Sequence, residues 1–146
     1  MTQQKIRHRS ADVAVGYAVT PAGRGIAYAT IATGTGRTLA KVPFGAVPLG
    51  ALDGREFGYA ALTAVAGYLR TNGFTRVRIR LGDGRTVDDL AARTSVPPAL
   101  TMAYVKARCA LHGFALARVE RAEPVETNEL EARARADIAQ RPAAAA

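Results

Sequence analysis

Three arginines at alternate positions mark a segment that could contact phosphate groups. Arg76, Arg78 and Arg80 alternate with aliphatic residues in the segment 76–81 (RVRIRL). Side chains of a β-strand point alternately to its two faces, so the three arginines share one face. Guanidinium groups are suited to binding phosphate oxygens. We call these residues the arginine strip and predict that it contacts nucleic acid. The alternative is an ordinary solvated face, or arginine stems lying under a helix.

A second basic cluster lies at the N-terminus. Lys5, Arg7 and Arg9 belong to a polar segment, residues 1–12, with no hydrophobic periodicity. This composition predicts a flexible basic arm, and such arms often follow a nucleic-acid backbone. The segment is not followed by the apolar region that a secretory signal requires.

The charge of the chain favours a polyanionic partner. Its formal net charge is +8, and residues 1–82 contain eleven basic and three acidic side chains, whereas residues 83–146 contain nine of each. Aromatic residues make up only 6% of the sequence, and most lie where we expect a core. We therefore expect weak, salt-sensitive nucleic-acid binding through phosphate contacts, without strong sequence preference. A basic protein without such a partner is the alternative.

Several other classes of protein are not supported by the sequence. It contains no CxxC or HExxH motif and no P-loop. The single cysteine, Cys109, excludes an internal disulfide, and we expect a reducing, cytoplasmic setting. No apolar run is long enough to cross a membrane, so no membrane partner is expected.

The order of the predicted elements defines the fold class. The sequence predicts five strands, over residues 13–20, 24–33, 38–43, 76–81 and 114–121. It predicts four helices, over residues 55–71, 86–92, 99–111 and 128–139. The order is β-β-β-α-β-α-α-β-α, which predicts an α/β domain with one five-stranded mixed sheet. We expect strands 13–20 and 76–81 to be parallel neighbours. The domain spans residues 13–139, and residues 140–146 are predicted to be a disordered tail.

Four segments in this order resemble type 1 ribonuclease H. They are residues 20–27 (TPAGRGIA), 59–64 (YAALTA), 77–84 (VRIRLGDG), and 119–121 (VER) leading to Asn128. They are similar to the turn into the second strand, the first helix, the strand that ends in a catalytic Asp, and the last strand before the closing helix. The resemblance covers nearly the whole domain and implies the ribonuclease-H fold.

The resemblance also implies where the catalytic carboxylates should lie. Ribonuclease H uses four of them to hold two divalent cations. Their positions fall at Ala14, Gly58, Asp83 and Asn128, so only Asp83 remains an anionic ligand. The nearest other acids, Asp12 and Glu56, each lie two residues before a lost position. A single carboxylate does not hold two Mg²⁺ ions. The resemblance therefore implies a degenerate active site.

Asp83 and Asn128 also have simple structural explanations. Asp83 lies in Gly82-Asp83-Gly84, a common turn sequence. Asn128, with Glu131 three residues later, is typical of a helix N-cap. Thr86 is likewise a predicted N-cap for the helix over 86–92.

Three functional hypotheses follow. The first is a non-catalytic ribonuclease-H-like domain that binds RNA, DNA or their hybrid and needs no cofactor. The second is a divergent, active ribonuclease H with a site rebuilt from Asp12, Glu56 and Asp83, which would require Mg²⁺ or Mn²⁺. The third is a structural or dimerising domain whose Ala-rich helices bind a second copy or another protein.

Overall fold

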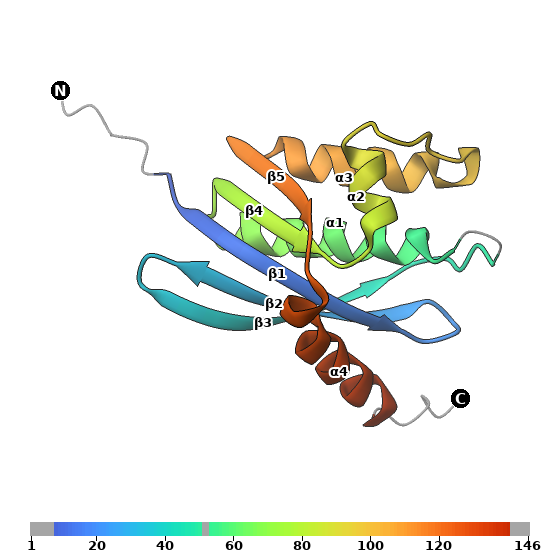
Figure 1. Ribbon diagram of the computed structural model, residues 1–146, viewed down its shortest axis with the longest axis horizontal. Helices are drawn as coiled ribbons and strands as arrows, with labels where there is room; N and C mark the ends of the chain where they lie inside the picture. The colour runs from blue at the N-terminus through green and yellow to red at the C-terminus, as the bar shows by residue number, and fades with distance from the viewer. Residues whose placement is uncertain (1–7, 51–52, 141–146) are drawn as a thin grey trace.

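The computed structural model describes residues 8–50 and 53–140, which form one five-stranded sheet with helices on both faces (Figure 1). The strands are β1 (Ser10–Val19), β2 (Arg24–Thr33), β3 (Gly36–Gly45), β4 (Arg76–Leu81) and β5 (Leu116–Arg121). The helices are α1 (Arg55–Thr71), α2 (Gly84–Leu90), α3 (Thr101–His112) and α4 (Pro124–Gln140), with a 3-10 turn, η1 (Pro98–Leu100), before α3. The predicted order of elements is confirmed.

The pairing of the strands makes the sheet mixed. Their order is β3-β2-β1-β4-β5. The first three strands form an antiparallel meander, and β4 and β5 add in parallel beyond β1. Val13 pairs with Ile79 in the parallel ladder between β1 and β4. The predicted parallel neighbours are therefore confirmed, and this pairing brings the ends of β1 and β4 together.

Helices α1 and α3 pack on one face of the sheet, and α4 packs on the other. Helix α1 buries Leu62, Val65 and Leu69 completely, and these residues follow the helical spacing read from the sequence. They meet the side chains of β1 that point to the same face, Val13 and Val15. This face contains most of the hydrophobic core.

Helix α4 lies very close to β1. A Cβ atom added at Gly16 would lie 2.6 Å from the Cβ of Leu130 and 2.7 Å from the backbone nitrogen of Glu131. Only glycine permits this approach at Gly16. The helix begins at Pro124, not at residue 128. Asn128 is therefore an exposed residue inside the helix, and its predicted role as an N-cap is wrong.

Other boundaries differ by a few residues from those predicted. Strand β1 begins at Ser10, so part of the expected arm belongs to the sheet. Helix α2 begins at Gly84, because Asp83 caps it, and Thr86 lies within the helix instead of capping it. Strand β5 begins at Leu116 and not at residue 114. Among the described residues, no helix is long and apolar enough to cross a membrane.

Candidate functional site

Strands β1 and β4 end beside the start of α1, and four residues meet there. We call Tyr17, Gly58, Asp83 and Thr86 the corner. In the parallel ladder Val15 pairs with Leu81, the last residue of β4. Continuing this register by two residues places Tyr17 beside Asp83. Tyr17 points to the same face as Val15, toward α1.

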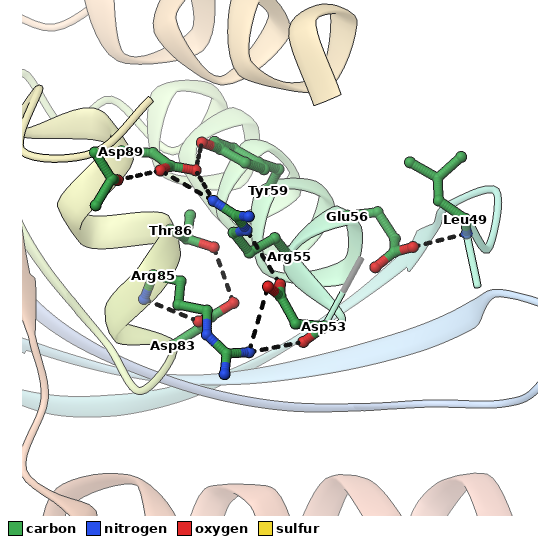
Figure 2. A network of polar contacts seen from close by, with 10 residues as sticks. Leu49, Asp53, Arg55, Glu56, Tyr59, Asp83, Arg85, Thr86 and Asp89 are labelled. Carbon is green, nitrogen blue, oxygen red and sulfur yellow. Dashed lines mark hydrogen bonds and ion pairs between the residues drawn. The ribbon is translucent and has the colours of Figure 1, made fainter. Parts of the chain in front are cut away.

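Asp83 is committed to hydrogen bonds at the start of α2 (Figure 2). The backbone N–H of Arg85 donates to its Oδ1 at 3.1 Å. The hydroxyl of Thr86 donates to its Oδ2 at 2.9 Å. Asp83 is thus the N-cap of α2, and each of its carboxylate oxygens already accepts a hydrogen bond.

Gly58 leaves no room for a side chain at the corner. A Cβ atom added there would lie 2.5 Å from the hydroxyl oxygen of Thr86 and 2.8 Å from Asp83 Oδ2. The same Cβ atom would lie 3.3 Å from the hydroxyl oxygen of Tyr17. The space that a longer residue at position 58 would occupy is therefore already filled by Thr86, Asp83 and Tyr17.

The Tyr17 hydroxyl lies in a partly buried, negatively charged environment. Burial raises the pKa of Tyr17 well above its ordinary value, and the nearby carboxylates of Asp83, Glu131 and Glu56 raise it further. Each of these effects disfavours the phenolate. Tyr17 therefore stays a neutral hydroxyl that can donate or accept a hydrogen bond.

Glu131 lies near the corner, whereas the sequence indicated for it only a role in capping the last helix, which is wrong because α4 begins at Pro124. Its carboxylate oxygen Oε1 lies 3.3 Å from where a Cβ atom at Gly82 would be. Glu131 follows Leu130 and precedes Ala134 by three residues, and these two are buried against the sheet. The helical spacing of this apolar face is the signal that could have shown Glu131 turning toward the sheet.

Comparisons with solved structures find the same arrangement of elements. Ribonuclease H1 from Halobacterium salinarum superposes with a TM-score of 0.69 at 17% identity, covering 88% of this chain and 98% of that one. LC11-RNase H1, solved in complex with an RNA/DNA hybrid, gives 0.64 at 11% identity, covering 89% and 99%. The N-terminal RNase H domain of rv2228c from Mycobacterium tuberculosis gives 0.60 at 16% identity, covering 83% and 95%.

The fold is that of a type 1 ribonuclease H. No protein-family model matches the sequence, and no curated protein matches it. The resemblance in the sequence is therefore confirmed at the level of the fold.

The corner does not fit the two-metal site that the ribonuclease-H fold implies. Within residues 8–50 and 53–140, no three His, Cys, Asp or Glu side chains are grouped so that they could hold a metal ion. Asp83 already accepts hydrogen bonds on both oxygens, and Gly58 and Tyr17 supply no carboxylate. Two divalent cations require a larger set of oxygen ligands than this.

Ala14 is not the residue of β1 that faces this ribonuclease-H corner. Ala14 pairs with Arg80 and points to the face covered by α4, whereas Tyr17 points to α1. The resemblance placed the first carboxylate at Ala14 by its distance from the turn at residues 20–27. This position is on the right strand, but its side chain points away from α1. Neighbouring residues of a strand point to opposite faces, so an error of an odd number of residues selects the wrong face.

Within the described part of the chain, the proposed substitute acids do not form a metal-binding group with Asp83. Asp12 lies on the sheet face opposite α1, where its carboxylate pairs with Arg80 at 3.2 Å. Glu56 is buried, and its Oε2 accepts a hydrogen bond from the backbone of Leu49 at 2.7 Å. Asn128 is exposed on α4. Asp12 is therefore on the other face of the sheet, and the Glu56 carboxylate, although close enough to influence Tyr17, is held by Leu49.

A buried polar network fixes α1 against α2 next to the corner (Figure 2). Asp89 of α2 is 1% exposed. It accepts a hydrogen bond from the Tyr59 hydroxyl at 2.6 Å, two from Arg55 at 3.2 Å, and one from Thr94. A buried carboxylate with this many donors is well stabilised. The network therefore holds Gly58 at a fixed distance from Asp83.

The arginine strip is largely neutralised by acids. Arg78 pairs with Glu120 at 2.6 Å and with Asp12 at 3.7 Å. Arg80 pairs with Asp12 and, at 2.9 Å, with Glu126. The hydrogen bond from Arg78 lowers the pKa of Glu120 below its ordinary value. These acids come from β1, β5 and α4.

Arg76 of the arginine strip and Arg9 of the N-terminal basic cluster differ in their contacts with the rest of the domain. Arg76 is exposed, and no described acid pairs with it. Arg9 donates to the backbone oxygen of Asn72 at 2.5 Å and lies over the Phe74 ring at 4.2 Å. Arg9 is thus bound to the domain. Lys5 and Arg7 lie outside the described residues.

Proposed function

We propose that this chain is a ribonuclease-H-like domain that binds nucleic acid and does not cleave it. The packing at Gly58 is the observation that supports the absence of cleavage in this proposal. Thr86 and Asp83 fill the space where α1 would need a carboxylate. Removing ligands from a two-metal site removes the electrostatic stabilisation of the transition state. No cofactor is part of this proposal.

The proposed nucleic-acid binding rests on the fold and the charge of the chain. LC11-RNase H1, which shares this fold, was solved in complex with an RNA/DNA hybrid. The present chain has a net charge of +8, which favours phosphate contacts. Arg121 lies beside Gly84 at the start of α2, and Arg85 follows it with a side chain 62% exposed. We propose these two arginines as phosphate contacts at the corner. Arg85 also pairs with Asp53 at 3.6 Å, a longer ion pair than those of Arg78 with Glu120 and Arg80 with Glu126, and a phosphate would compete with it.

The arginine strip and the arm have a smaller part in the proposal. Arg76 is free to bind phosphate, whereas Arg78 and Arg80 would have to leave their acidic partners. Lys5 and Arg7 remain proposed contacts of the arm. Arg9 could contribute through its charge while it stays on Phe74.

Fluorescence anisotropy with labelled RNA, DNA and hybrid tests binding. We expect weak binding to all three at low salt, with a steep loss at physiological salt. Arg85→Ala/Arg121→Ala should weaken binding more than the triple change of Arg76, Arg78 and Arg80 to Ala. A matched control is Arg37→Ala/Arg135→Ala, which removes two exposed arginines from β3 and α4.

The same samples test catalysis. We expect no cleavage of the hybrid with Mg²⁺ or Mn²⁺. Metal-dependent cleavage that disappears in Asp83→Ala would instead establish the divergent enzyme. If no probe binds at low salt, the nucleic-acid proposal is wrong, and a second copy or another protein becomes the partner to test.

A further inference from the structure

A groove lies between the β2–β3 end of the sheet and helices α1 and α3. Its volume is about 810 Å³, within the range of sites for small organic ligands. Most of its lining is aliphatic or aromatic. The residues that distinguish it chemically are Arg24, Phe44, Glu56, Met102 and Lys106.

Glu56 gives the groove an unsatisfied hydrogen-bond acceptor. The residue is 5% exposed, and its Oε2 accepts from the backbone N–H of Leu49. Its Oε1 is buried and accepts no hydrogen bond from residues 8–50 or 53–140, the part of the chain that the structure describes. A buried polar atom without a partner is unfavourable. A ligand that brings an N–H group to this carboxylate would remove that cost.

Phe44 and Met102 give the groove surfaces for a flat, apolar ring. The Phe44 ring packs over Gly25, where an added Cβ would lie 2.1 Å from the ring. The ring is held edge-on to Tyr17, with centroids 6.0 Å apart. Met102 of α3 is 67% exposed. A fixed aromatic ring and a flexible thioether suit stacking against a nucleobase.

Two cations complete the groove. Arg24 begins β2 and Lys106 lies on α3, and both are exposed. Neither is paired with an acid among the described residues. A ligand for this groove therefore has an apolar ring, an N–H edge and a negatively charged substituent.

We propose that the groove holds one unstacked guanine of a single-stranded nucleic acid. Guanine presents two neighbouring N–H donors on its Watson–Crick edge, and these would meet the Glu56 carboxylate. Its ring would stack against Phe44 and Met102, and its phosphates would contact Lys106 and Arg24. Proteins that read single strands combine stacking with hydrogen bonds to this edge. The inference rests on the proposed function and adds a base preference to it.

An NMR titration of the full chain with guanosine monophosphate tests the groove directly. We expect amide shifts at groove residues such as Gly45, Ala60 and Ala103, and weaker shifts with adenosine or uridine monophosphate. Glu56→Gln keeps the size of the side chain and an acceptor for Leu49, but places an NH₂ group in the site. It should weaken guanosine monophosphate binding by roughly tenfold or more. Glu129→Gln, at an exposed acid of α4, should have no effect.

A second variant keeps the test decisive if Glu56→Gln does not fold. Lys106→Ala should weaken guanosine monophosphate binding and leave guanosine binding unchanged, because Lys106 contacts only the phosphate. Equal binding of all three nucleotides, or shifts confined to residues outside the groove, would overturn the guanine site.

Anisotropy with two RNA oligonucleotides separates this inference from the proposed function. A guanine-containing strand should bind more tightly than an all-uridine strand, and Glu56→Gln should remove the difference. If both strands bind equally and Glu56→Gln changes neither, the guanine site is wrong and the proposed function stands. If neither strand, the duplex DNA nor the hybrid binds, the proposed function fails, and the guanine site fails as part of a nucleic-acid interface.

Discussion

Gly58 is a tightly packed residue at the position where the ribonuclease-H resemblance implies a catalytic carboxylate. Its hydrogen atoms face Thr86 and Asp83 at distances that exclude a Cβ. The position therefore requires glycine within a helix, although glycine lowers helix stability.

Gly58→Ala should destabilise the protein, because the added methyl group must displace Thr86 or Asp83. Overpacking of this kind costs about 1–3 kcal/mol. Gly67→Ala on the same helix is the matched control, since nothing lies within 4 Å of its Cβ position. It should be neutral or stabilise the protein by up to about 1 kcal/mol. Urea unfolding of both variants measures the difference, and equal effects would show that the corner is not tightly packed.

Tyr17 should make stability depend on alkaline pH. Its pKa in the folded protein is raised above the ordinary value of 10.0 by burial and by Asp83, Glu131 and Glu56. The protonated phenol therefore contributes stability below pH 10, and this contribution is lost as the pH rises above that value. In Tyr17→Phe, the free energy of unfolding should fall less steeply above pH 10.

The control for this measurement is Tyr68→Phe on the exposed side of α1. It should retain the pH dependence of the parent protein. A Tyr17→Phe curve that coincides with the parent curve would mean that the Tyr17 phenol is not desolvated.

At the level of the elements, Asp83 joins β4 to α2. It follows the end of β4 and accepts hydrogen bonds from Arg85 and Thr86 in the first turn of the helix. Asp83 therefore has a structural role as the N-cap of α2.

Asp83→Ala should lose about 1 kcal/mol of stability, as expected for removal of an N-cap. Asp83→Asn should lose much less, because an asparagine oxygen can still accept from Arg85 and its amide can donate to Thr86. Thermal unfolding compares the two variants. Asp88→Ala, at a half-exposed acid on the same helix, should change stability by less than about 0.5 kcal/mol. Equal losses for Asp83→Ala and Asp83→Asn would contradict the capping role.

Over the whole molecule, positive charge is distributed unevenly. The face of β4 with the arginine strip is balanced by Asp12, Glu120 and Glu126. Apart from Arg76, cations that pair with no acid of the described residues include Arg24 and Lys106 beside the groove. Under the proposed function, we expect the net charge of +8 to attract nucleic acid in general and the unpaired or weakly paired cations to decide where it binds.

The N-terminal arm should contribute to the salt dependence of binding. Lys5→Gln/Arg7→Gln removes two positive charges. Each phosphate contact changes the slope of log K against log salt by about 0.9 for duplex DNA. The slope should therefore become shallower by up to about two in the double variant, measured by anisotropy over a salt series. An unchanged slope would show that the arm does not contact the duplex.

The sequence was sufficient to predict the order of elements and the parallel pairing of β1 with β4. These features depend on local patterns: alternation in Arg76–Leu81, helical spacing in Arg55–Thr71, and the handedness of crossovers between strands. The resemblance also identified Asp83 and Gly58 as neighbours at the corner. The order of elements, the pairing of β1 with β4 and the positions of Asp83 and Gly58 could be predicted because they depend on local sequence patterns or on the order of the segments.

The tertiary structure decided which side chains meet. Tyr17, not Ala14, faces Asp83. The two residues are three positions apart on β1, and side chains an odd number of positions apart point to opposite faces of the sheet. Glu131, not Asn128, approaches β4, because α4 begins at Pro124 and its rotation is fixed by contact with Gly16. The arginine strip meets acids from three other elements, and no local pattern encodes such pairs. Sheet register, helix rotation and contacts between distant segments are fixed only when the core packs.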